Sequence, residues 1–116
     1  MEQNELIMDW FLWHQAVEYV KQDLPDVESA DLRFPLIAGW VLRRIGSQVF
    51  LKEKEAAQKL KENRIRIAKE KFDQGEYFVV WSQRGDTDIF RIQEGRLRTE
   101  VQKKMEDIIK IMTEVK

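Results

Sequence analysis

The sequence predicts a mostly helical α+β domain, with four or five helices and a small antiparallel β-hairpin before the C-terminal helix. Three observations lead to this class. Apolar residues recur at helical spacing near both ends of the chain. Lysine, glutamate, alanine and glutamine dominate its middle, and these residues favour helix. Between Gly75 and Gly95 the composition changes to aromatic and β-branched residues, which favour strands.

The first predicted helix covers residues 4–24. Asn4 is a suitable N-cap, and we expect Pro25 to end the helix because the residue before a proline is pushed out of the helical conformation. Residues 26–34 then form a polar linker. The apolar stripe of this helix advances in steps of three and four residues and consists of Leu6, Trp10, Trp13, Val17, Val20 and Leu24.

A second helix is expected to begin at Pro35, because a proline in the first helical turn loses no hydrogen bond. Its apolar stripe contains Ile37, Val41 and Ile45. At Gly46-Ser47 two alternatives remain open. The chain either breaks into two helices, or one helix runs through at the cost of a single glycine, about 1 kcal/mol. The composition then predicts helix as far as Gln74, with Gly75 as its C-terminal cap.

Residues 76–81 and 88–92 predict a β-hairpin with its turn around Arg84-Gly85-Asp86. Residues 96–98 are a candidate for a third strand. Thr99–Gln102 matches a capping box, and the last helix is expected to follow it. We expect the stripe of the first helix to pack against Val41, Ile45 and the last helix. The apolar stripe of that last helix is Val101, Met105, Ile108, Met112 and Val115.

Composition limits what this chain can be. Its 116 residues match one domain, residues 1–116, and 43% are apolar, which is enough for one core. There is no cysteine and one histidine, so a zinc or thiolate site lacks ligands and we expect no metal or cofactor. No apolar run approaches the roughly 20 residues of a membrane span. The first five residues lack the basic region of a signal peptide, and a cytoplasmic location is expected.

Charge is spread unevenly along the chain. The net charge of −1 argues against a strong general attraction to nucleic acid or to an anionic membrane. Residues 1–34 nevertheless carry two basic and eight acidic side chains, whereas residues 35–74 carry ten basic and five acidic ones. An acidic first helix and a basic middle segment can pair within one chain, or they can serve partners.

No catalytic constellation is visible in the sequence. His14 is the only histidine, and it lies one helical turn before Glu18. It can be read as a general base oriented by a carboxylate. It can also be read as a helix-face residue with an ordinary contact to the next turn. We favour the second interpretation, and we therefore predict a protein that is not an enzyme.

The first predicted helix is apolar over more than half of its circumference. This is more apolar surface than one small core can easily bury. The long helix adds a thin seam of small residues that would let a second helix approach closely. We therefore predict an interaction or structural protein that self-associates as a symmetric homodimer. The candidate interface consists of Met8, Leu12, Tyr19, Ala56, Ala57 and Leu60.

The alternative is a nucleic-acid-binding module. A long basic helix beside a hairpin with arginine at its tip can bind nucleic acid, although Glu53, Glu55, Glu62 and Glu70 interleave with the basic residues. The expected element order, with Asp88–Ile92 before the last helix, is similar to a winged-helix DNA-binding domain with a C-terminal dimerisation helix. If the chain breaks at Gly46-Ser47, the third predicted helix extends from residue 47 to residue 74 and is about twice as long as a recognition helix. The candidate contacts are Arg64, Arg66, Lys69, Arg84 and Arg91.

Overall fold

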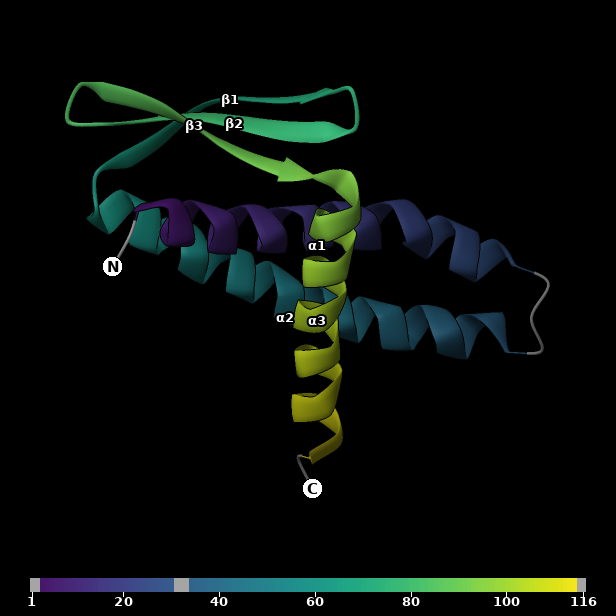
Figure 1. Cartoon of the computed structure of the whole chain (residues 1–116). Helices are drawn as coiled ribbons and strands as arrows, with labels where there is room; N and C mark the ends of the chain where they lie inside the picture. The colour runs from purple at the N-terminus through teal and green to yellow at the C-terminus, as the bar shows by residue number, and fades with distance from the viewer. Residues whose placement is uncertain (1–2, 31–33, 115–116) are drawn as a thin grey trace.

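The computed structural model describes residues 3–30 and 34–114, which form three helices and one three-stranded antiparallel sheet (Figure 1). The α+β class with a helical majority is confirmed. The expected number of four or five helices is wrong for the described residues. The elements in chain order are α1 (Gln3–Ser29), α2 (Pro35–Glu62), β1 (Ile65–Asp73), β2 (Glu76–Gln83), β3 (Asp86–Gln93) and α3 (Glu94–Glu114).

Helix α1 is longer than its sequence suggests at both ends. It begins at Gln3, so Asn4 lies inside the first turn, and it continues through Pro25, where a stop was expected. A proline inside a helix costs about 3 kcal/mol. Glu28 beyond the proline forms an exposed ion pair with Arg43 of α2 at 2.9 Å, and such a pair offsets at most about 1 kcal/mol of this cost. Residues 26–29 of the expected linker are helical, and residues 31–33 lie outside the described residues.

Helix α2 is one continuous helix through Gly46-Ser47, which confirms the second of the two alternatives. The expected extension to Gln74 is wrong, because the helix ends at Glu62 and β1 begins at Ile65. Arg64 adopts a left-handed conformation with φ 58° between the two elements. The order of three helices that resembled a winged-helix domain is therefore absent from the described part of the chain.

The sheet has the strand order β1-β2-β3. The hairpin turn at Arg84-Gly85 is confirmed, with φ of 53° and 89°. Gln74 and Gly75 form the matching turn between β1 and β2, so Gly75 is a turn residue and does not cap a helix. Residues 96–98 belong to α3 and do not form a strand. Thr99 also lies inside α3, where its hydroxyl donates to the Gly95 carbonyl at 3.0 Å and caps no helix.

One face of the sheet packs on α1, and α3 crosses both long helices (Figure 1). Burial of the α1 stripe is confirmed except at Trp10, which is half-buried, and Leu24, which is also partly exposed. On α2, Ile45 packs against this core as expected, but the expectation for Val41 is wrong because it is 41% exposed. Val115 of the last stripe lies outside the described residues. The largest fully buried side chains are Ile7, Phe11, Val49, Val79 and Leu97.

Candidate interaction surface

The N-terminal half of α2 presents an apolar face to solvent. Leu36 is 78% exposed, Trp40 is 61% exposed and Ile37 is 60% exposed. Leu36 lies one turn before Trp40, and Ile37 lies one turn before Val41, so these four side chains form two adjacent rows on the helix. Phe34 precedes the helix and is also exposed. We call Phe34, Leu36, Ile37, Trp40 and Val41 the α2 apolar face.

Two glycines on the opposite side of α2 explain why these large side chains point outward. A Cβ atom at Gly39 would lie 2.7 Å from Cγ of Glu28, and one at Gly46 would lie 2.9 Å from Cγ1 of Val20. A side chain at either position would therefore require the Glu28 or Val20 side chain of α1 to move aside. Since the two glycines are seven residues apart, they share one helix face. This spacing is the sequence feature that could have identified the exposed face.

The interface residues expected from the sequence lie elsewhere. Leu12, Ala56 and Leu60 are buried in the chain's own core, so this conformation does not present them to a partner. Met8 and Tyr19 are partly buried against the same core, and Ala57 is exposed. Strand β1 was not expected from the sequence, and the sheet to which it belongs covers apolar surface of α1. Phe11, for example, packs against Tyr77 and Phe90 with ring centroids 5.8 and 6.4 Å apart.

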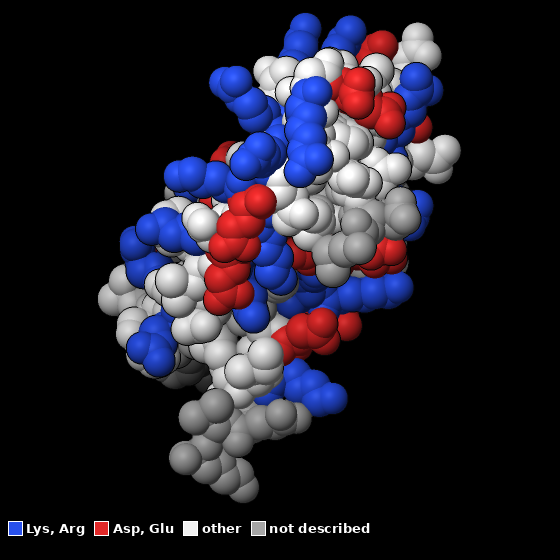
Figure 2. Space-filling model, turned by 90° about the vertical axis from the view of Figure 1, so that its left-hand side faces the viewer, with Lys and Arg blue, Asp and Glu red and all other residues white. Residues whose placement is uncertain are grey.

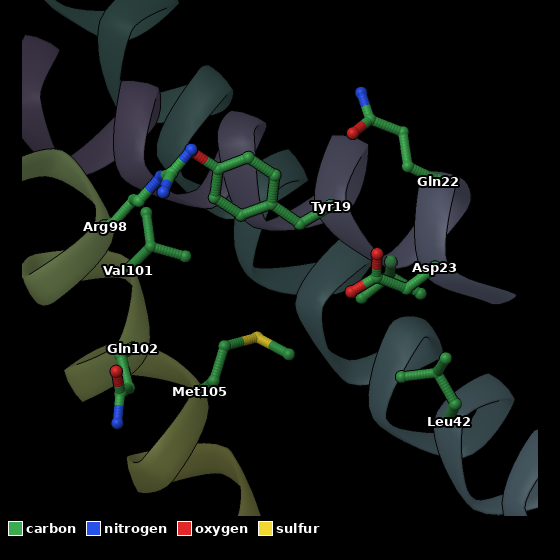
Figure 3. A pocket seen from close by; sticks show the side chains of 9 residues that line it. Tyr19, Gln22, Asp23, Leu42, Arg98, Val101, Gln102 and Met105 are labelled. Atoms are coloured by element: carbon green, nitrogen blue, oxygen red, sulfur yellow. The ribbon is translucent and has the colours of Figure 1, made fainter. Parts of the chain in front are cut away.

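A groove of about 470 Å³ lies where α1, α2 and α3 meet. Figure 3 shows the Tyr19 phenol beside the Arg98 guanidinium at one end, with Met105 and Leu42 further along. Burial raises the pKa of Tyr19, and the neighbouring Arg98 acts in the opposite direction. The phenol is therefore neutral at physiological pH. Much of the lining is aliphatic, which suits the groove to an apolar side chain better than to acid–base chemistry.

His14 bridges two carboxylates from other elements. Its Nδ1 lies 2.8 Å from Oε2 of Glu53 on α2, and its Nε2 lies 3.2 Å from Oε1 of Glu70 on β1. Trp10 stacks on the ring with centroids 4.9 Å apart. Hydrogen bonds to Glu70 and Glu53 raise the pKa of His14 from 6.5 to about 9, although burial opposes them. The imidazole is therefore protonated at neutral pH.

This environment corrects both sequence interpretations of His14. Its partners are Glu53 and Glu70, and they lie far along the chain, whereas the interpretations invoked Glu18 one turn away. An imidazolium cannot accept a proton, so His14 does not serve as a general base at neutral pH. The two carboxylates hold opposite ring nitrogens and do not converge on a common point. Within residues 3–30 and 34–114, no group of three or more His, Asp or Glu side chains is arranged so that it could hold a metal ion.

The candidate nucleic-acid contacts are all exposed. Arg66 and Lys69 lie on β1 and Arg91 lies on β3, and the strand register brings these three to the same face of the sheet. Arg64 and Arg84 lie together at one end of that sheet, because Ile65 pairs with Gln83. Figure 2 views the molecule from this end and shows more lysine and arginine than acidic side chains.

The comparisons with known proteins identify a family. A family model described as YhjD protein matches residues 1–113, and the chain therefore belongs to the YhjD family. No curated protein and no solved structure matches the chain. In the part of the chain that the structure describes, none of the helices has the length and apolar character needed to cross a membrane.

Proposed function

We propose that this YhjD-family protein is a non-enzymatic interaction protein that assembles as a symmetric homodimer through the α2 apolar face. The exposure of Leu36, Ile37 and Trp40 on one helix is the observation that carries the proposal. Contiguous apolar patches on a small protein typically mark an interaction site. Tryptophan is also among the commonest anchors of protein interfaces. We further propose a cytoplasmic location, which suits a chain without cysteine.

Apolar contacts would contribute more to the stability of such a dimer than exposed charge pairs would. Covering one large apolar side chain contributes about 1.5–3 kcal/mol. The Leu36, Ile37, Trp40 and Val41 side chains are 41–78% exposed, so covering their remaining exposed surface in two copies would together contribute about 7–14 kcal/mol. Association costs about 4–15 kcal/mol of lost freedom. Exposed ion pairs contribute only about 0–1 kcal/mol each, so they could not offset this cost alone.

A second copy of the chain is the partner that we favour. A helix face with two adjacent rows of apolar side chains can pair with itself about a two-fold axis, and such closed dimers are the commonest oligomers. The Arg44 guanidinium lies 5.5 Å from the Trp40 ring centroid, which adds a cation beside the apolar face. Exposed Asp23 and Asp26 on α1 supply opposite charges that could steer the two copies together.

Light scattering of the full chain tests the proposal. We expect the mass of two chains at high concentration and a shift toward one chain over about a hundredfold dilution, as mass action requires. Raising the salt concentration should leave the dimer intact because apolar contacts dominate it. A mass of one chain at every concentration would remove the homodimer and assign the α2 apolar face to a different protein partner.

A further inference from the structure

The face of the sheet that turns away from α1, which we call the outer sheet face, combines cations with apolar side chains. Its first row across the three strands contains Lys71 on β1, Phe78 on β2 and Arg91 on β3. The next row contains Lys69, Val80 and Ile89. Neighbouring strands lie about 4.8 Å apart. An aromatic ring therefore lies between two cations in one row, and an aliphatic surface continues beside it.

Strand formation separates the charges of β1. A bulge between Ile67 and Lys69 keeps Lys69 on the same face as Arg66. Glu70 faces the other way, where its carboxylate pairs with His14 at 3.2 Å. On a helix, Glu70 and the neighbouring lysines would have shared one solvent-exposed surface. On the strand, the lysines remain on the outer sheet face while their acidic neighbour is held beneath it.

The cations of this face have no acidic partners among the residues that the structure describes. Arg66, Lys69, Lys71 and Arg91 are each without a carboxylate within ion-pair distance, whereas ion pairs occur on all three helices. The acidic residues of the face, Asp73 and Glu76, lie at its end beside the β1–β2 turn. At the opposite end Arg64 and Arg84 add positive charge, because Ile65 pairs with Gln83 there.

The ring of Phe78 adds a second kind of contact. The Arg91 guanidinium lies 5.3 Å from the centroid of this ring, and Ile89 beside them is 44% exposed. Aromatic rings and guanidinium planes both stack on unpaired nucleobases. Lysines around such a platform neutralise phosphates. A base-paired duplex would satisfy the lysines but would not offer its bases to the ring.

We propose that the outer sheet face binds single-stranded nucleic acid, with bases stacked on Phe78 and Arg91 and phosphates held by Arg66, Lys69 and Lys71. This site is separate from the α2 apolar face and does not depend on the homodimer. The net charge of −1 is compatible with it, because much of the acidic charge belongs to residues 1–34. Sequence preference is expected to be weak, since stacking and phosphate contacts tolerate every base.

Fluorescence anisotropy with a labelled mixed-sequence single-stranded RNA of about 20 nucleotides tests this proposal at low salt. The variant Lys69→Glu/Lys71→Glu should weaken binding by at least tenfold. A matched variant, Lys103→Glu/Lys110→Glu, makes the same charge change on α3 and should stay within about twofold of the original chain. Phe78→Leu keeps an apolar side chain but removes the ring, and it should weaken binding about tenfold.

Three competitors decide the class of ligand. An unlabelled single strand should displace the probe, whereas duplex of the same sequence and polyglutamate should compete at least tenfold less well. Equal competition by polyglutamate would overturn the proposal in favour of an acidic protein partner. No binding by the original chain, or equal losses in the two lysine double variants, would overturn it as well. Circular dichroism of each variant confirms that it is folded.

Discussion

The imidazole Nδ1 of His14 lies 2.8 Å from Oε2 of Glu53, and this contact joins α1 to α2 across 39 residues of chain. The other ring nitrogen contacts Glu70 of β1 at 3.2 Å. Trp10 stacks on the ring and shields one of its faces from solvent. One protonated side chain therefore ties together three elements, and its charge state contributes to the stability of the fold.

Stability is expected to fall as pH rises through the slightly alkaline range. The pKa of His14 is about 9 in the folded chain and 6.5 as its ordinary value, so the folded state binds the proton more tightly. The resulting stabilisation is fully present below pH 6.5 and is lost as pH rises toward 9. We expect the free energy of unfolding to decrease by about 1–3 kcal/mol across this window. Urea titrations at a series of pH values measure it.

His14→Gln is the control for that experiment. Glutamine keeps a hydrogen-bonding side chain but cannot carry the charge. The variant should be less stable than the original chain below pH 6.5, and its stability should change little up to pH 9. If the variant and the original chain lose the same free energy over this window, another group is responsible.

Truncation of Trp13 and truncation of Trp40 should change the free energy of unfolding to very different extents. Trp13 is 7% exposed, and the Lys104 ammonium lies 4.8 Å from its ring centroid. Trp13→Ala is expected to cost about 3–5 kcal/mol, because it leaves a cavity in the core. Trp40→Ala changes an exposed side chain and should alter the stability of the monomer by about 0.5 kcal/mol or less. Denaturant melts at low protein concentration compare them, and a loss under about 1 kcal/mol for Trp13→Ala would contradict its burial.

Gly46 and Gly95 provide a matched pair of helical glycines. An added methyl group at Gly46 would meet Cγ1 of Val20 at 2.9 Å, whereas nothing lies within 4 Å of one at Gly95. Valine has little freedom to move aside. We expect Gly46→Ala to destabilise the chain by about 1–3 kcal/mol despite its better helix propensity. Gly95→Ala should be neutral or stabilise by up to about 1 kcal/mol. Thermal melts that rank the two variants in the opposite order would show that α1 and α2 are not closely packed there.

If the α2 apolar face forms the homodimer, a polar substitution on that face should weaken it more than the same substitution elsewhere. Ile37 on the α2 apolar face and Ile111 on α3 have similar exposure, 60% and 53%. Ile37→Ser should shift the population from dimer to monomer in light scattering, because it removes buried apolar surface from the interface. Ile111→Ser makes the same chemical change on another surface and should leave the dimer intact. Equal effects of the two variants would show that the apolar contacts are not confined to α2.

Several elements were predictable because local interactions specify them. The α1 stripe has an unbroken helical period, and the Arg84-Gly85 turn needs two residues with positive φ between alternating strands. β1 was missed because Lys69, Glu70 and Lys71 favour helix by composition. Its two-residue alternation begins at Ile65 and Ile67, and these side chains become favourable in a strand only when the core buries them.

The candidate surfaces depended on the same missed strand. With β1 assigned to a helix, Glu70 counted as a neighbour that neutralised the lysines around it. In the strand, Glu70 faces His14 and the lysines face solvent. The sheet covers much of the apolar surface of α1 that was expected to form an interface. The most exposed apolar side chains, Leu36, Ile37 and Trp40, instead lie on the α2 apolar face.

By itself, the sequence determined the fold class, the apolar stripe of α1 and the β2–β3 hairpin. For the second helix it left two alternatives, a break at Gly46-Ser47 or one continuous helix. These features depend on residues within a few positions of one another, and periodicity and turn chemistry record such interactions directly. Only the tertiary structure decided which side of α2 is buried, where β1 begins and which carboxylates hold His14. Each of these depends on partners far apart in the chain, whose burial free energy outweighs local propensities of about 1 kcal/mol or less per residue.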